Sequence, residues 1–202
     1  AGVVSVDTWY HIAYVRASNV WTVYLDGTSV ISADPGSLDF DDTSVNLLFG
    51  SMNWTHDDFT GYMDEIRVSK GIARYSSSFN PSTTAFTADQ YTKLLLHCDG
   101  ADGGTTFTDS SNAAPRHTIT AYGDVTNTRA VKKVGESSIK FDGNGDYFSV
   151  PASSDWNRGT GDWTVEAWFQ NAGGTSGTGY GNGIFPVFTV GVGWTAAFVS
   201  DW

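Results

Sequence analysis

The sequence predicts an all-β protein whose strands form an antiparallel β-sandwich. Short segments rich in β-branched and aromatic residues recur along the chain, and turn-forming residues separate them. The chain has 23 Gly and only 5 Pro, a composition typical of many tight turns. Residues 69–75 are the one helix-like stretch. We therefore expect more than a third of the residues in antiparallel strands and no helix longer than about two turns.

The first half of the chain contains four predicted strands. Residues 9–16 form a nearly continuous apolar run, as in a strand that is buried on both faces. Residues 21–25 alternate in polarity and lead into Asp26-Gly27, a dipeptide typical of hairpin turns. Residues 47–49 form a short apolar strand, and residues 61–69 form a longer one.

Regular alternation in residues 61–69 predicts which side chains share a face. One face would carry Tyr62, Asp64, Ile66 and Val68, and the other Met63, Glu65 and Arg67. On that second face Glu65 and Arg67 are close enough in sequence to form an ion pair.

The second half repeats this style without repeating the sequence. Residues 163–169 alternate, so that Trp163, Val165, Ala167 and Phe169 are expected on one face. Residues 173–183 are Gly-rich and are expected to form a surface loop. The other predicted strands are residues 94–98, 138–141, 147–150, 184–190 and 194–199, with a turn at 142–146.

The charge balance argues against nucleic acid and membrane insertion. The formal net charge is −11 and the isoelectric point is about 4.4, so the chain repels a duplex or an anionic bilayer. No apolar run approaches the roughly 18 residues of a membrane span. Cys98 is the only cysteine, which excludes an intrachain disulfide, and its apolar surroundings predict a buried thiol.

Motifs along the chain resemble the two halves of a laminin-G-like domain. In the first part they are WYHIAYVR at 9–16, YLDG at 24–27 and GYMDEIRV at 61–68, which resemble the C-terminal half. Those that resemble the N-terminal half lie at 94–97, 109–111, 141–143, 145–147 and 161–168. Each motif is short, but their number and order are specific. The chain is therefore similar to the concanavalin-A-like lectin-glucanase superfamily, which implies a jelly-roll sandwich.

The resemblance is strongest to the varieties found in bacterial surface proteins and phage virion proteins. Residues 69–75 and Phe79-Asn80-Pro81 are similar to the phage type in particular. The order of the halves is unusual, because residues 1–90 resemble the C-terminal half and residues 91–202 the N-terminal half.

Two explanations of this order remain open. The chain is either a window cut from a tandem array of domains or a permuted sandwich whose two halves close on each other. We favour a piece of a longer chain, also because there is no initiator Met or signal peptide. In either case residues 9–16 and 61–69 are too apolar to remain sheet edges. We expect them to pair with strands of residues 91–202 or of another chain.

The resemblance also implies a structural calcium ion. Related sandwiches hold calcium near an acidic loop, with help from an acid on the strand of residues 61–69. Calcium prefers carboxylate and carbonyl oxygens, which such a loop supplies. The predicted ligands are Asp99, Asp102, Asp109 and Asp64, and the alternative is a solvated acidic loop.

Aromatic residues in or beside loops are candidates for stacking on sugar rings. They are Trp54, Trp156, Tyr180 and Trp194. The alternative for each is packing in the core or against a loop. His11 and His97 lie in strands and are expected to be structural, since no nucleophile with acid support accompanies them.

The sequence predicts no catalytic site. Glycosidases of this fold class carry paired acids on one face of a strand, in the pattern E-x-D-x-x-E, and this pattern is absent. Asp64 and Glu65 are adjacent, so a regular strand would point them to opposite faces.

We therefore expect a non-catalytic structural or adhesive module of a virion tail or fibre, or of a cell-surface protein. It would act outside the cell, recognise glycan or protein, and assemble with copies of itself or neighbouring domains. The alternatives are a carbohydrate-binding module of a larger secreted enzyme and, more weakly, a glycoside hydrolase of the same fold.

Overall fold

The computed structural model describes residues 4–33, 46–51, 58–157, 159–173, 184–190 and 195–199. These residues form thirteen β-strands that cover more than a third of the chain, and they contain no helix. The helix-like stretch predicted at residues 69–75 is therefore absent, because the preceding strand continues to Lys70. The strands are β1 (Trp9–Ala17), β2 (Val20–Leu25), β3 (Thr28–Ala33), β4 (Leu47–Phe49), β5 (Thr60–Lys70), β6 (Thr92–Leu96), β7 (Thr120–Tyr122), β8 (Thr126–Thr128), β9 (Ser138–Asp142), β10 (Tyr147–Val150), β11 (Trp163–Asn171), β12 (Ile184–Val190) and β13 (Thr195–Val199).

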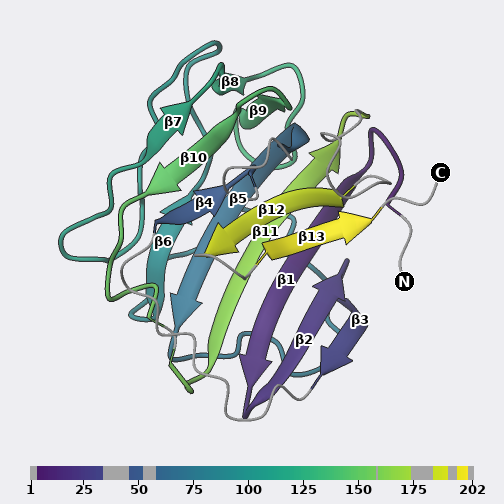
Figure 1. Cartoon of the computed structure of the whole chain (residues 1–202), viewed down its shortest axis with the longest axis vertical. Helices are drawn as coiled ribbons and strands as arrows, with labels where there is room; N and C mark the ends of the chain where they lie inside the picture. The colour runs from purple at the N-terminus through teal and green to yellow at the C-terminus, as the bar shows by residue number, and fades with distance from the viewer. Residues whose placement is uncertain are drawn as a thin grey trace.

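The strands form two antiparallel sheets, which confirms the predicted β-sandwich. The first sheet has eight strands in the order β3-β2-β1-β11-β5-β9-β8, with β6 pairing the C-terminal part of β5. The second has five, in the order β13-β12-β4-β10-β7. Figure 1 shows the shorter strands of the second sheet crossing in front of the long strands of the first. This arrangement is that of a jelly-roll sandwich.

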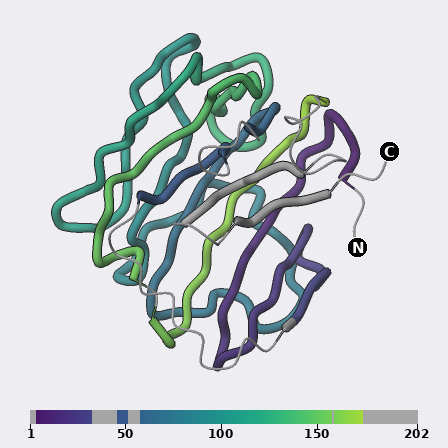
Figure 2. Tube along the Cα trace, in the orientation of Figure 1, coloured from purple at the N-terminus to yellow at the C-terminus, as the bar shows by residue number. Residues whose placement is uncertain are grey.

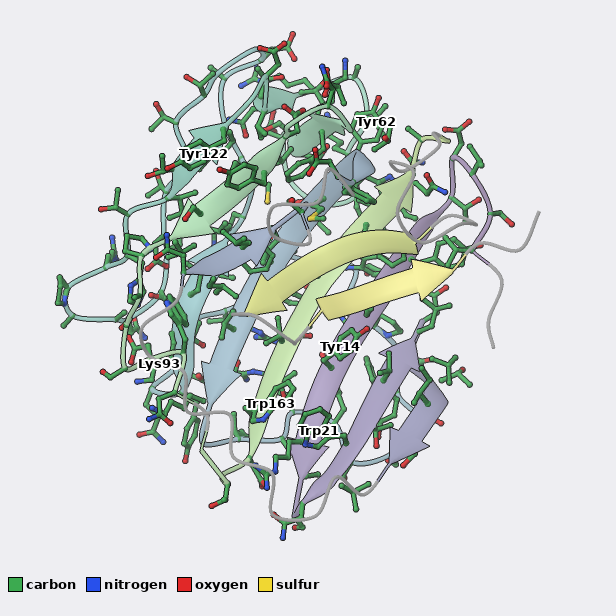
Figure 3. All side chains as sticks on the ribbon, in the orientation of Figure 1. Tyr14, Trp21, Tyr62, Lys93, Tyr122 and Trp163 are labelled. Atoms are coloured by element: carbon green, nitrogen blue, oxygen red, sulfur yellow. The ribbon has the colours of Figure 1, made fainter. Side chains whose placement is uncertain are left out.

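The hydrophobic core lies between the sheets. The predicted alternation of β11 is confirmed, since Trp163, Val165, Ala167 and Phe169 all belong to the core cluster. The second sheet contributes buried side chains such as Phe49. Trp21 and Trp163 contact each other edge to face at 5.8 Å at one end of the core (Figure 3). Removal of this apolar surface from water is the main stabilising contribution to the fold.

Both sheets combine strands from the two parts of the chain. In the first sheet β11 pairs with β1 on one side and with β5 on the other. In the second sheet β4 pairs with both β10 and β12. The prediction that residues 9–16 and 61–69 pair with strands of residues 91–202 is confirmed. The assignment of each part to one half of a laminin-G-like domain stays a prediction.

A β-bulge interrupts the alternation of β5. Arg67 pairs with Glu166 and Asp64 pairs with Trp168, so Glu65 and Ile66 together oppose the single residue between those partners. Glu65 has a positive φ of 49°, the left-handed conformation found at many bulges. The prediction of one face with Tyr62, Asp64, Ile66 and Val68 is therefore wrong in part: Ile66 and Val68 do share the core, but Met63 joins them there.

The outer face of the first sheet is covered by residues 71–91, which we call the strap. The strap follows β5 and passes behind β11, β1 and β2 before it returns to β6 (Figure 2). Phe79 N donates to Gly27 O at the hairpin between β2 and β3. On the return, Ser82 O accepts a hydrogen bond from Trp168 Nε1 at 3.2 Å. The sheet is thus buried on both faces, as the apolar run at residues 9–16 predicts.

Beneath the strap lies a buried ionic cluster centred on Glu166. The Glu166 carboxylate accepts from Arg67 Nη2 at 2.6 Å and from the Tyr75 hydroxyl at 2.7 Å. His11 Nε2 lies 3.2 Å from Glu166 Oε2. Arg67 therefore pairs with Glu166, and the predicted pairing of Arg67 with Glu65 is wrong because the partner comes from another strand. Tyr75 belongs to the strap, so the cluster joins the strap to the sheet.

Candidate functional site

A cavity of about 230 Å³ lies where the C-terminal end of β6 meets the loop of residues 106–110 and strands β8 and β9. One wall is apolar and contains Leu96, Phe107 and Ile139. Leu96 and Ile139 are buried core residues. The Phe107 ring packs against Phe148 of β10 with ring centroids 4.4 Å apart, so it is held in place. This wall offers a fixed apolar surface at the edge of the core.

The remaining lining of the cavity is polar. Hydroxyl groups come from Thr106, Thr108 and Ser110, an amide from Asn127 and a carboxylate from Asp99. Asn127 Nδ2 donates to Gly104 O at 3.1 Å, which fixes the loop against β8. A cavity with an apolar wall and a few polar groups is the usual form of a small-ligand site.

Asp99 is held by the turn that precedes β9. Its Oδ1 accepts hydrogen bonds from the backbone N–H groups of Glu136 and Ser137. Cys98, the residue before it, has a positive φ of 61° and is buried, as its apolar surroundings predict. Burial raises the pKa of the Cys98 thiol well above its ordinary value, and the charges of Asp64 and Glu65 raise it further. The thiol is therefore protonated and unreactive at neutral pH.

The β5 bulge places two buried acids near this turn. Asp64 is 0 % exposed; its Oδ2 accepts from the N–H groups of Lys133 and Val134, both at 2.9 Å, and its Oδ1 has no hydrogen-bond partner among the residues that the structure describes. Burial raises the pKa of Asp64 to about 7, and the neighbouring charges of Glu65 and Asp99 add to the effect.

Glu65, the second acid of the bulge, contacts both the strap and β6. Its Oε2 accepts from the N–H of Phe86 in the strap at 2.7 Å. Its Oε1 lies 2.8 Å from Nδ1 of His97. Burial raises the pKa of Glu65, against the hydrogen bonds from Phe86 and His97 that lower it. His97 thus contacts Glu65, and its structural role stays a prediction.

Asp64→Asn is expected to stabilise the protein at high pH. The folded-state pKa of Asp64, about 7, lies above the unfolded value of 3.8, so ionisation of Asp64 destabilises the fold as pH rises between these values. Asparagine keeps an acceptor for Lys133 and Val134 but cannot ionise. The free energy of unfolding should exceed that of wild type by up to about 4 kcal/mol at pH 8 and show little gain at pH 4. Urea unfolding at both values measures this difference, and a gain that is equal at both pH values would contradict the assigned role.

The four acids predicted to bind calcium do not form one cluster. Asp64 and Asp99 lie within electrostatic range of each other. Asp102 is exposed and accepts from Arg129 N at 2.9 Å. Both oxygens of the buried Asp109 are occupied by donors, namely Leu95 N, Ser111 N, Ser111 Oγ and His117 N.

Asp102 and Asp109 therefore accept hydrogen bonds from backbone and side-chain donors of several segments, and the two acids share none of these donors. In the part of the chain that the structure describes, no group of three or more His, Cys, Asp or Glu residues could hold a metal ion. Calcium stays a prediction, and among its predicted ligands Asp64 Oδ1 is a buried oxygen without a hydrogen-bond partner in the described residues. If it binds there, millimolar calcium should raise the melting temperature of wild type and leave that of Asp64→Asn unchanged.

Trp156 lies in the core. Its side chain is 2 % exposed, its Nε1 donates to Pro151 O at 2.8 Å, and its ring lies beside His117 with centroids 4.5 Å apart. No face of this ring is open to a sugar in the structure. The other predicted stacking residues, Trp54, Tyr180 and Trp194, lie outside the described residues.

Sequence reasoning missed the aromatic residues that the structure exposes. Phe107 lines the cavity, although it stands alone among Thr residues and gave no signal. Tyr122 of β7 is 44 % exposed and stacks on Tyr147 of β10 at 4.5 Å (Figure 3). These two are cross-strand partners, which only the strand register reveals.

Comparison with known proteins gives one match. Residues 1–74 match the family model of the Concanavalin A-like lectin/glucanases superfamily. This segment holds β1 to β5, less than half of the chain. Searches of curated proteins and of solved structures gave no match. At the level of the family, the match indicates carbohydrate binding. Among the described residues, no helix is long and apolar enough to cross a membrane.

Proposed function

We propose that this protein is a non-catalytic binding module that recognises glycan through the cavity beside Asp99. The observation that carries the proposal is the composition of the cavity wall. Sugar rings present hydroxyl groups at their rim and C–H groups on their faces. The hydroxyls of the exposed Thr106 and Thr108 suit the rim, and the half-buried ring of Phe107 suits a face. The volume of about 230 Å³ suits one sugar residue.

The acids near the cavity support binding without hydrolysis. Glycoside hydrolysis by the usual mechanism needs two carboxyl groups that flank the scissile bond. Among the described residues that line the cavity Asp99 is the one acid, and it is engaged with the turn before β9. Asp64 has a pKa near 7, a value suited to a general acid, but it is fully buried and does not line the cavity.

The proposed setting is the surface of a virion or a cell. Such a module would serve as a structural and adhesive part of a tail, fibre or surface protein, next to copies of itself or neighbouring domains. The acidic net charge of −11 supports an extracellular partner that is neither nucleic acid nor membrane. The second candidate is a carbohydrate-binding module of a larger secreted enzyme, which the family match also favours. Flanking sequence distinguishes the two, since a fibre contains repeated domains and an enzyme a catalytic one.

The variant Thr106→Trp tests the proposed site. Thr106 is exposed and lines the cavity, so an indole there should fill the cavity without disturbing the core. On a glycan array, followed by calorimetry with the glycans that bind wild type, the variant should bind at least about tenfold more weakly. Its melting temperature should match that of wild type.

Thr105→Trp is the matched control. Thr105 is also exposed, is adjacent in sequence and does not line the cavity, so its variant should bind like wild type. Equal affinity of wild type and Thr106→Trp would refute the site, and an array without any bound glycan would refute the function.

A further inference from the structure

The charged groups around the cavity are predominantly acidic. Asp99 lines it. Two buried acids lie close by: Asp64 accepts from the N–H groups of Lys133 and Val134, just before the Glu136 and Ser137 N–H groups that hold Asp99, and Glu65 contacts the lining residue His97. Among the described residues that line the cavity the basic side chain is His97, and its Nδ1 already faces Glu65 Oε1 at 2.8 Å. A protonated His97 would therefore be neutralised by its partner.

Basic side chains near these acids face away from the cavity. The backbone N–H of Lys133 donates to Asp64. The side-chain Nζ of Lys133, however, lies 4.0 Å from the centroid of the Trp168 ring, on the strap side of the sheet. Arg67 is held by Glu166 beneath the strap. Among the described residues that line the cavity there is no Lys or Arg.

The acidic groups also include one buried oxygen that no group of the described residues satisfies. Asp64 Oδ1 is buried without a hydrogen-bond partner. Its other oxygen accepts from two backbone N–H groups and Asp64 does not line the cavity, so its preference for a nearby positive charge adds to that of Asp99 and does not replace it. The acidic groups thus select ligands by their charge, in addition to the selection by shape that the cavity wall provides.

We infer that the cavity selects a sugar that carries a free amine and rejects a sugar that carries a carboxylate. The inference rests on the proposed glycan binding and names the class of sugar. An ammonium group beside Asp99 gains a favourable interaction, whereas a uronate meets like charge. Each effect should change the affinity on the order of tenfold relative to the neutral sugar at low ionic strength.

Three matched sugars test the inference. The dissociation constants of D-glucose, D-glucosamine and D-glucuronic acid, and of the corresponding galactose series, are measured by NMR titration of the full chain at pH 6.5 without divalent cations. The expected order is amine tightest, neutral intermediate and uronate weakest. Equal constants within each series, or a preference for the uronate, would overturn the inference while leaving glycan binding intact. If none of the six sugars binds and the glycan array is also empty, the proposed function fails together with the inference.

The variant Asp99→Asn separates charge from shape. Asparagine keeps an oxygen that can accept from Glu136 N and Ser137 N, so the turn should stay in place. The ratio of amine to uronate affinity should fall about tenfold or more. Asp102→Asn is the matched control, since Asp102 lies in the same loop, caps Arg129 N and does not line the cavity. A ratio that survives in Asp99→Asn, or that falls equally in Asp102→Asn, would contradict the role of Asp99.

Discussion

Replacing Glu166 with glutamine should lower the free energy of unfolding by about 3–5 kcal/mol, the loss typical of a broken buried ion pair. Glu166 is almost completely buried, and burial alone would raise the pKa of its carboxyl. The hydrogen bond with His11 and the charge of Arg67 outweigh burial and lower that pKa. Glutamine has nearly the same shape but leaves the Arg67 guanidinium without a counter-charge. It also presents an amide to the donors of Arg67 and Tyr75.

The same cluster predicts a dependence on pH. Because the folded-state pKa of Glu166 is lowered, its contribution is present above the ordinary value of 4.5 and is lost as pH falls through the folded-state pKa. The difference between wild type and Glu166→Gln should therefore shrink in acid. Guanidinium unfolding at pH 7 and at successively lower pH measures it. Glu136→Gln, at an exposed site, is the control and should change stability by less than about 0.5 kcal/mol. A loss below about 1 kcal/mol for Glu166→Gln would contradict the role of the cluster.

Gly27→Ala should cost about 3 kcal/mol and detach part of the strap. Gly27 has a φ of 74°, and a Cβ atom there would lie 1.7 Å from the backbone oxygen of Phe79. The positive φ costs an alanine about 1 kcal/mol, and the steric overlap adds about 1–3 kcal/mol. The Cβ atom is fixed to the backbone of residue 27, and the oxygen that it meets belongs to the backbone of Phe79. A side-chain rotation therefore cannot relieve the overlap.

Gly145→Ala separates the two contributions. Gly145 has a similar φ of 79° and open space around the position of a Cβ atom, so its alanine variant should lose only about 1 kcal/mol. Hydrogen exchange should show faster exchange of the Phe79 amide in Gly27→Ala alone, because that amide donates to Gly27 O. Equal losses of stability in the two variants would mean that the strap does not pack on the hairpin as described.

The sequence predicts those parts of the fold whose signals are local. Asp26 and Gly27 both have positive φ, as the dipeptide predicts for a two-residue hairpin turn. The alternation in β11 is regular and correctly assigns its core face. Ser111 N donates a hydrogen bond to the carboxylate of Asp109, two residues earlier, and this bond forms a local turn. Both residues belong to the Asp-Ser-Ser motif, so this turn is also a local signal. Reading that motif as a turn would have separated Asp109 from the predicted calcium ligands.

The candidate site depends on contacts between distant parts of the chain. At the bulge the sequence has Glu65 and not a glycine, so nothing in it marks a bulge. Regular alternation was therefore the natural prediction, and it placed Asp64 and Glu65 on opposite faces. The cavity is formed by β6, the 106–110 loop, β8 and β9, whose register is set by the whole sheet. Periodicity along one strand contains no information about such a meeting of strands. Charge composition alone likewise did not show that Asp99 and Asp64 come together while Asp109 stays apart.

The most direct test of the account is a map of where a sugar binds. Amide shifts of the isotope-labelled chain are followed during titration with D-glucosamine. We expect the largest changes at residues that line the cavity, such as Thr106, Phe107 and Asn127, and almost none at Tyr122 and Tyr147, whose strand neighbours Ala121 and Phe148 face the core instead. Changes confined to the outer face of β7 and β10, with unchanged signals around the cavity, would contradict the account.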